Sequence, residues 1–237
     1  VTLSLVNSEL GTILPVRDVA RSIATFKKKL GRGISDYPYL HVDATQGASL
    51  LPLNPHNMGA DFLTFDGSKM YAPKGVGILI ARRERNLNSL FHGGGQEKGL
   101  RPGTQNVSGA HALSVALIEC GKIQEKEYVR LAELQEYFEK KLRAVFPNAL
   151  INGMGISKKD KRLPSFTNVC IPGLNAEYAV VQLDKEGVAA SSASACQSAG
   201  GSGISYVVKA LSEGEKCGGS SLRFSCGRFT KRGDLDY

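Results

Sequence analysis

One cysteine, Cys196, lies in a setting typical of a reactive thiol. It follows small and hydroxyl residues at 191–195, and glycines come soon after it at 200, 201 and 203. The thiolate is the nucleophilic form of cysteine, and its reactivity depends on solvent access and local charge. Glycine widens the backbone conformations open to a segment and so extends its reach. The pattern therefore predicts an exposed, mobile nucleophile rather than a packed core cysteine.

A lysine far upstream, Lys69, is a second candidate for chemistry. It follows an apolar run and stands between Gly67 and a Pro-Lys-Gly turn at 73–75. A lysine that forms a Schiff base must be held close to a carbonyl and be partly desolvated, and a strand-to-turn junction can do this. Asp43 ends another apolar run and could pair with the protonated pyridine nitrogen of a cofactor. The alternatives are a surface lysine and an aspartate that caps a turn.

Two further stretches could bind anionic groups. A glycine-rich loop at 92–104 offers backbone amides and the Thr104 hydroxyl to a phosphate. The loop has neither a Walker lysine nor Rossmann spacing, so a nucleotide site is weakly supported and a structural turn is the alternative. Arg223 lies on a strand-like run, and its guanidinium offers two parallel donors to a carboxylate. A surface ion pair is the alternative for this arginine.

The elements that must position these residues alternate in type along the first third of the chain. Strand–helix–strand spacing indicates a parallel sheet with crossover helices, and ligands of such sheets gather at the carboxyl ends of strands. Asp43 and Lys69 both follow such ends. We expect strands at Thr2–Val6, Tyr39–Val42, Phe62–Phe65 and Gly77–Ala81, and a helix at Val16–Leu30.

A long helix is expected from about Ser108 to Val145, because apolar residues recur there at steps of three and four. The segments after it, including a strand-like run at Ser221–Ser225, indicate a smaller α+β unit. We place the domain boundary near residue 122, which gives domains 1–122 and 123–237. The expected fold class is α/β.

Composition narrows the class of protein. At 42% apolar and 22% charged residues, the chain resembles globular proteins, and no apolar stretch approaches the roughly 20 residues of a membrane helix. The net charge is +8, but the lysines and arginines are scattered along the chain and mixed with glutamates. We therefore expect no direct nucleic-acid binding. Five widely spaced cysteines predict neither a disulfide framework nor a metal site, which favours a reducing compartment. The chain opens on an apolar run without Met, so we expect more chain to precede it.

Taken together, the motifs resemble those of the cysteine desulfurases, the NifS/IscS-like branch of the fold-type I pyridoxal-phosphate enzymes. The resemblance covers nearly the whole chain, except that the family's N-terminal part is missing. The matching stretches are His-Val-Asp-Ala-Thr-Gln (41–46), Gly-Ser-Lys-Met-Tyr-Ala-Pro-Lys-Gly (67–75), the glycine-rich loop (92–104), Ser-Ser-Ala-Ser-Ala-Cys (191–196) and Ser-Leu-Arg-Phe-Ser-Cys-Gly-Arg (221–228).

This resemblance implies a partial large domain with a mostly parallel sheet, followed by a small domain that carries the cysteine loop. It also implies a role for each matching residue. Lys69 would hold pyridoxal phosphate as a Schiff base, Asp43 would pair with the pyridinium nitrogen, and Gln46 with the ring hydroxyl. Ser68, Ser8 and Thr104 would lie at the cofactor, Thr104 reaching the phosphate of a neighbouring subunit in a homodimer. Arg223 would hold the carboxylate of the substrate.

The implied reaction converts L-cysteine to L-alanine. Cys196 would attack the sulfur of the cofactor-bound cysteine and keep it as a persulfide, and it could also serve as a transient iron–sulfur ligand; no other metal is expected. The persulfide would pass to an acceptor or scaffold protein for iron–sulfur clusters or thiolation. The implied compartment is the cytoplasm, or an organellar matrix in a eukaryote. Two alternatives stay open, a selenocysteine lyase and a non-catalytic relative that binds sulfur-transfer partners.

Three positions depart from the family pattern. Ser8 stands where an asparagine usually contacts the cofactor, and Ser68 replaces the usual histidine before the lysine. Asp66 replaces a serine that donates to the phosphate. A carboxylate there repels a dianionic phosphate unless it is protonated or turned away. We therefore expect weaker cofactor binding by this polypeptide alone.

Overall fold

The structure, a computed structural model, describes residues 1–82, 87–153, 161–192, 205–211, 217 and 219–237. Backbone contacts divide the chain into two compact units. The first unit consists of residues 1–5 and 14–124, and the second of residues 6–13 and 125–237. Residues 6–13, which a boundary near 122 leaves in the first domain, therefore belong to the second unit.

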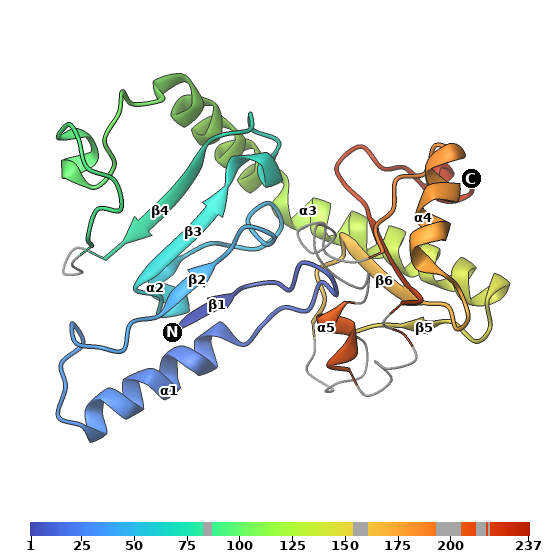
Figure 1. Cartoon of the computed structure of the whole chain (residues 1–237), viewed down its shortest axis with the longest axis horizontal. Helices are drawn as coiled ribbons and strands as arrows, with labels where there is room; N and C mark the ends of the chain where they lie inside the picture. Colours follow the sequence, from blue (N-terminus) through green and yellow to red (C-terminus); the bar gives the residue numbers. More distant parts are fainter. Residues whose placement is uncertain (83–86, 154–160, 193–204, 212–216, 218) are drawn as a thin grey trace. The chain divides into compact units, whose positions relative to one another are not determined.

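The first unit is built on a four-stranded sheet in the order β1-β2-β3-β4 (Figure 1). Its strands are β1 (Thr2–Ser4), β2 (His41–Asp43), β3 (Phe62–Asp66) and β4 (Gly77–Ala81). The first three are parallel, whereas β4 runs antiparallel to β3. The link between β3 and β4 is short for the crossover that a parallel pair requires, so the chain turns back on itself. The predicted mostly parallel sheet is confirmed.

Helices and short turns complete the first unit. They are α1 (Val16–Lys29), α2 (Pro55–Met58), the 3₁₀ turns η1 (Gly67–Met70) and η2 (Gln96–Gly99), and the first part of α3 (Val107–Val145). The core lies around the central strands, where Val42 is fully buried and Leu63 is 1% exposed. Branched apolar residues suit a strand that is covered on both faces.

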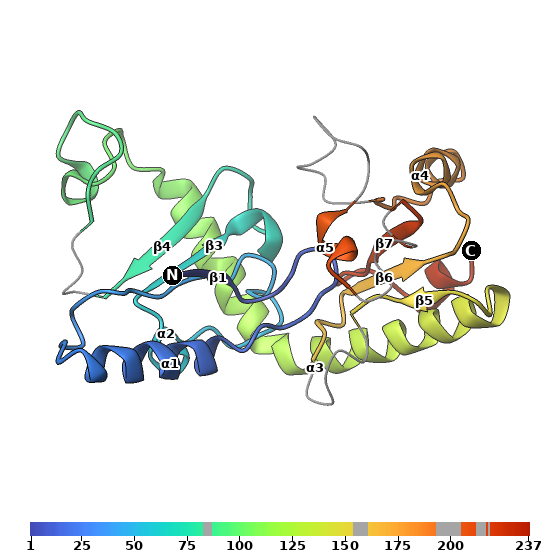
Figure 2. The same ribbon diagram turned by 60° about the horizontal axis from the view of Figure 1, so that its bottom comes forward.

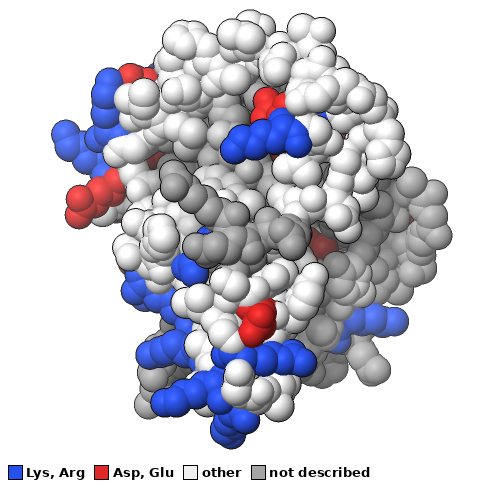
Figure 3. All heavy atoms as spheres, turned by 90° about the vertical axis from the view of Figure 1, so that its left-hand side faces the viewer, with Lys and Arg blue, Asp and Glu red and all other residues white. Residues whose placement is uncertain are grey.

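Basic residues gather on α1 and the turn after it. Residues 16–32 hold six Lys or Arg and a single acidic residue, Asp18, a net +5 of the chain's +8. Figure 3 shows basic side chains crowded toward its lower edge, where α1 lies in Figure 1. The expectation that basic residues are scattered and mixed with glutamates does not hold for this helix.

The second unit contains a three-stranded antiparallel sheet, β5-β6-β7, with helices packed against it (Figure 2). The strands are β5 (Leu150–Ile151), β6 (Phe166–Cys170) and β7 (Ser221–Ser225), and the other elements are α4 (Ala176–Lys185), α5 (Tyr206–Lys209) and η3 (Arg232–Leu235). One sheet face packs Val169 and Leu222 against Leu142 of α3 and Ala176 of α4. The opposite face carries Asn168, Cys170 and Arg223, since side chains alternate along a strand.

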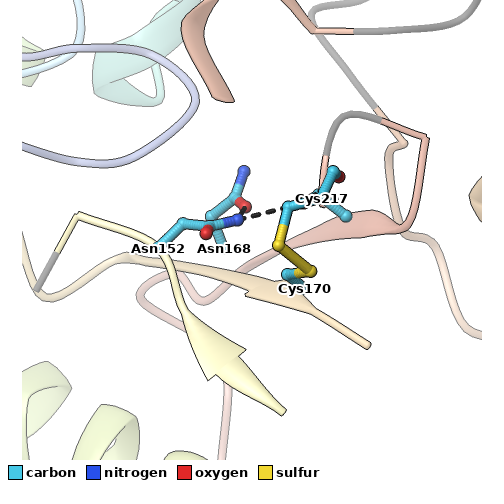
Figure 4. Close-up of a disulfide and its surroundings, with 5 residues drawn as sticks. Asn152, Asn168, Cys170 and Cys217 are labelled. Carbon is cyan, nitrogen blue, oxygen red and sulfur yellow. Dashed lines mark hydrogen bonds between the residues drawn. A yellow bond between two sulfur atoms is a disulfide. The ribbon is translucent and has the colours of Figure 1, made fainter. Parts of the chain in front are cut away.

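A disulfide joins Cys170 to Cys217 on this second face, with 5.4 Å between their Cα atoms (Figure 4). This finding overturns the expectation that the cysteines form no disulfide. The two residues are 47 positions apart, so only the folded sheet brings them together. Cys120 and Cys226 are free, and Cys120 is buried as expected. In the described parts of the chain, no helix is long and apolar enough to cross a membrane.

Candidate functional site

Asp43 and Lys69 come from neighbouring parallel strands of the first unit. Asp43 is the last residue of β2 and lies opposite Thr64 of β3, and η1, which contains Lys69, follows β3 directly. Both residues therefore stand at the carboxyl edge of the parallel strands, where α/β proteins bind ligands. The sequence predicts that both residues follow the carboxyl ends of strands, and the structure places them there.

The surroundings of Asp43 suit a hydrogen bond to a ligand. Its Oδ1 atom accepts from the Thr45 amide at 2.9 Å, and the side chain is half-buried between the fully buried Val42 and Ala44. Among the described residues, the second carboxylate oxygen has no hydrogen-bond partner, so it can accept from a pyridinium N–H. Gln46, also half-buried, follows on the same edge. These two side chains fit the ring of pyridoxal phosphate.

Lys69 is exposed, and so is Ser68 beside it. Their turn is tight because Gly67 lies against Val76, the residue before β4: a Cβ atom at Gly67 would stand 3.0 Å from Val76. A cavity of about 1240 Å³ between α1 and α2 in the first unit is lined by neither Lys69 nor Asp43. The first unit by itself therefore does not provide the partial desolvation that the sequence predicts for this lysine.

Asp66 caps the turn that carries Lys69. Its Oδ1 accepts from the Ser68 amide at 2.6 Å, which satisfies a donor at the start of η1. The hydrogen bonds from Ser68 hold the pKa of Asp66 below its ordinary value, and the charge of Lys69 adds to this effect. The carboxylate is therefore ionised at neutral pH and hydrogen-bonded to the turn. The repulsion between an ionised Asp66 and a cofactor phosphate stays a prediction from the sequence.

The glycine-rich loop at 92–104 is largely exposed, including Thr104. Its η2 turn places Glu97 and Lys98 in the left-handed region, at φ 49° and 58°. Such backbone conformations cost non-glycine residues about 1 kcal/mol or more each and gather at functional sites. The Gln96 side chain accepts from the Gly103 amide at 3.2 Å and closes the loop. In the first unit, no described contact connects Thr104 to Asp43 or Lys69.

In the second unit, a turn at residues 7–11 docks onto the sheet face that carries Arg223. The Asn7 side chain accepts from the amides of Glu9 and Leu10, both at 2.9 Å, which forms the turn. Gly11 closes it at φ 74°, where a Cβ atom would stand 3.1 Å from Phe166. Only glycine fits there without strain. The turn thus presents two successive carbonyls, those of Ser8 and Glu9, to β6 and β7.

Arg223 binds the first of these carbonyls. Its Nη1 donates to the Ser8 oxygen at 2.9 Å, while its Nε is buried and has no hydrogen-bond partner among the described residues. A buried donor left unpaired costs about 1–3 kcal/mol, which an acceptor on a ligand would relieve. Burial lowers the pKa of Arg223, and the carboxylate of Glu9 opposes that shift. A half-buried guanidinium with a spare donor is suited to a carboxylate ligand.

Three residues of this network escaped the sequence analysis. Asn168 lies opposite Arg223 in the sheet and donates to the Glu9 carbonyl at 3.2 Å. Ser205, fully buried, donates its hydroxyl to the Glu9 carboxylate. Glu9 itself is 2% exposed. No local signal in the sequence marks Glu9, because glutamates are usually exposed and its partner Ser205 is distant in the chain.

Cys196 lies outside the described residues, so its setting stays a prediction. The other candidates divide between the units, with Asp43, Gln46, Ser68, Lys69 and Thr104 in the first and Ser8 and Arg223 in the second. The first group offers an amine and a carboxylate at one sheet edge. The second offers a guanidinium for an anion.

The family model described as aminotransferase class-V matches residues 1–237, and the chain belongs to this pyridoxal-phosphate-dependent family. Its curated relatives include cysteine desulfurases. The cysteine desulfurase IscS of Dictyoglomus turgidum is 32% identical over 98% of the chain, and NifS of Azotobacter vinelandii is 33% identical over 97%. A mitosomal cysteine desulfurase of Encephalitozoon cuniculi is 34% identical over 100%.

The chain spans about half the length of these relatives, between 51% and 55%. Solved structures agree with the fold. A NifS-like protein from Rickettsia africae matches 99% of the chain and 58% of its own, with a TM-score of 0.81 and 27% identity. Another NifS-like protein matches 100% and 57%, with a TM-score of 0.83 and 27% identity. The predicted fold, that of fold-type I pyridoxal-phosphate enzymes, is confirmed.

Proposed function

We propose that this chain carries the catalytic residues of a cysteine desulfurase, which converts L-cysteine to L-alanine and keeps the sulfur as a persulfide on Cys196. The observation that carries the proposal is the placement of Asp43 and Lys69 at the carboxyl ends of two adjacent parallel strands, within a whole-chain family match. Because the chain spans half of its relatives, the activity belongs to the complete enzyme, which we expect to be a homodimer.

The residues of the first unit would hold pyridoxal phosphate. When bound, this cofactor withdraws electrons from the α-carbon of an amino acid. Lys69 would bind its aldehyde carbon, and the Asp43 carboxylate would keep the ring nitrogen protonated. Gln46 would donate to the ring hydroxyl, and Ser68 and Thr104 would approach the phosphate, Thr104 from the partner subunit. Desolvation of Lys69 would come from the cofactor and from chain outside the first unit, because Lys69 is exposed there.

In the second unit, Arg223 would bind the substrate carboxylate and Ser8 would lie beside the cofactor. The thiolate of Cys196 would then attack the substrate sulfur. An S–S bond forms as the C–S bond breaks, and the electron pair left on the substrate carbon takes up a proton to give alanine. The product on the protein is a persulfide, which a second protein accepts for iron–sulfur cluster assembly or thiolation.

The cellular location of the protein is proposed here from its relatives, because the cysteines no longer indicate it. The disulfide between Cys170 and Cys217 removes the argument that unpaired cysteines indicate a reducing compartment. The Encephalitozoon relative is described as mitosomal. We propose a cytoplasmic or organellar location on this ground.

Absorbance and product assays test the proposal. The purified protein is titrated with pyridoxal phosphate, and a visible band is expected that Lys69→Ala abolishes and that Lys74→Ala, an exposed lysine five residues on, retains. Alanine release from cysteine is expected to vanish with Cys196→Ser. A band that survives Lys69→Ala would remove the cofactor assignment.

Two substrates separate the alternatives. A desulfurase releases alanine from cysteine and loses this activity with Cys196→Ser, whereas a selenocysteine lyase can keep turnover of selenocysteine after that change. A protein that binds neither cofactor nor substrate but captures sulfur-transfer partners would be the non-catalytic relative. Cysteine turnover that survives Cys196→Ser would contradict the proposed mechanism.

A further inference from the structure

Glu9 is a buried acid beside the proposed carboxylate-binding arginine. It is 2% exposed, and its backbone neighbour Ser8 accepts the hydrogen bond from Arg223 Nη1 at 2.9 Å. Asn168, opposite Arg223 in the sheet, donates to the Glu9 carbonyl at 3.2 Å. The backbone of this turn is thus fixed at two successive carbonyls. Glu9 therefore has a defined place next to the guanidinium.

The Glu9 carboxylate does not itself bind the guanidinium, because no hydrogen bond or ion pair joins the two among the described contacts. It accepts from the Ser205 hydroxyl instead, and Ser205 is fully buried. Its charge nevertheless reaches Arg223, since Glu9 opposes the effect of burial on the pKa of that arginine. Glu9 therefore acts on Arg223 through space, and the buried Nε of Arg223 has no hydrogen-bond partner among the described residues.

A fixed negative charge near the guanidinium changes which anions can bind. Arg223 alone would attract any anion, and a dianion more strongly than a monoanion. A buried carboxylate close by repels the anion and so cancels much of this attraction. The repulsion energy is twice as large for a dianion as for a monoanion. A singly charged carboxylate can still bind, because the guanidinium offers it directional hydrogen bonds.

We propose that Glu9 is a specificity-determining residue that restricts the Arg223 site to monocarboxylates and excludes dianions such as sulfate and phosphate. The proposal rests on the proposed function, in which Arg223 binds the carboxylate of an amino acid. It assigns Glu9 a role through charge, whereas a structural role would depend on its hydrogen bond with Ser205. These two roles can be separated by substitution.

The test measures how anions protect Arg223 from modification by phenylglyoxal, read by peptide mass spectrometry on the purified protein. This readout requires neither cofactor nor turnover. Propionate serves as the monocarboxylate and sulfate as the dianion. Glu9→Gln removes the charge and keeps an oxygen that can accept from Ser205. We expect protection by propionate to strengthen about threefold and protection by sulfate about tenfold. Removing the charge lowers the repulsion energy twice as much for a dianion, so its binding constant rises by the square of the factor for a monoanion.

Two control variants isolate the charge of Glu9. Ser205→Ala removes the hydrogen bond and keeps the charge, and Glu133→Gln removes an exposed acid of the same unit. Both are expected to keep the sulfate-to-propionate ratio of the unmodified protein within twofold. Circular dichroism checks that each variant is folded.

The outcomes distinguish this inference from the proposed function. If propionate protects Arg223 and Glu9→Gln leaves the anion ratio unchanged, the role of Glu9 is refuted and the function stands. A ratio that changes equally in Ser205→Ala also refutes it, because the hydrogen bond would then be responsible. If no anion protects Arg223, the assignment of Arg223 as a carboxylate site fails first, and the inference with it.

Discussion

Asn168 and Arg223 lie opposite each other on β6 and β7, and each donates a hydrogen bond to one of two successive carbonyls, those of Glu9 and Ser8. The pair holds residues 6–13 on the sheet of the second unit, although the five residues before them, which include β1, belong to the first. A short polar turn is thus held on the sheet by two strand side chains.

Replacing Asn168 with alanine should release one end of this attachment. Asn168 is 4% exposed, donates to Glu9 and accepts from Asn152 at 2.7 Å, so the change leaves buried groups without partners. We expect the free energy of unfolding to fall by about 2 kcal/mol or more. Urea denaturation followed by circular dichroism measures it. Asn57→Ala, an exposed asparagine, is the control, and equal loss in both variants would argue against the network.

Removing the disulfide should lower the stability of the second unit. Cross-linking residues 47 positions apart limits the unfolded chain, a stabilisation of roughly 2–4 kcal/mol. The double variant Cys170→Ser/Cys217→Ser should lose this amount in urea denaturation without reductant. The unmodified protein should approach the variant once reductant is added. Identical unfolding midpoints with and without reductant would mean that the bond does not form.

The Cys226 thiol should react slowly with iodoacetamide at neutral pH. Burial raises its pKa, although the charge of Arg130 opposes the shift, and only the thiolate is nucleophilic. Its alkylation rate, read by peptide mass spectrometry, should therefore rise with pH over a higher range than that of a free cysteine. Cys196 should react first. Equal rates for the two thiols at neutral pH would contradict the exposed, reactive setting predicted for Cys196.

The stabilising effect of Asp66 should disappear in acid. Its pKa is lowered by hydrogen bonds from Ser68, so the folded state favours the ionised form. This stabilisation is fully present above the unfolded pKa, roughly pH 4. It is lost as pH falls through the lower folded value. The difference in thermal unfolding between the protein and Asp66→Asn should therefore be largest at pH 7 and shrink as the pH falls below the unfolded pKa, and a constant difference would contradict it.

The same residue offers a test of cofactor affinity. An ionised Asp66 repels a dianionic phosphate, whereas a serine can donate to it. Asp66→Ser should therefore bind pyridoxal phosphate several-fold more tightly in absorbance titrations at neutral pH, with Asp36→Ser, an exposed aspartate, as the control. Weaker binding by Asp66→Ser would indicate that the cap on η1 matters more than the repulsion.

Much of the first unit could be predicted because its signals are local. The strand at Gly77–Ala81 has the expected bounds, and the helix that begins at Val16 ends one residue early. Alternation and helical spacing act over a few residues, so one sequence reveals them. The carboxyl ends that carry Asp43 and Lys69 follow from the same reasoning. The four strands of this sheet lie side by side in the same order as they occur in the chain.

What could not be predicted depends on contacts between distant segments. The pairing of Cys170 with Cys217 requires the antiparallel sheet to exist first, and periodicity says nothing about it. Glu9 shows no special pattern by itself, because its importance comes from Ser205, almost two hundred residues away. The exposure of Lys69 was also missed, since burial depends on what covers a turn rather than on the turn itself.

The bond between Cys170 and Cys217 makes residues 170–217 a closed covalent ring. A protease that cuts one peptide bond inside this ring opens it without releasing a fragment. A nicked molecule therefore keeps its full length on a gel until a thiol is added, and then divides into two pieces. Limited digestion with and without reductant would thus map cleavage sites inside the ring separately from those outside it.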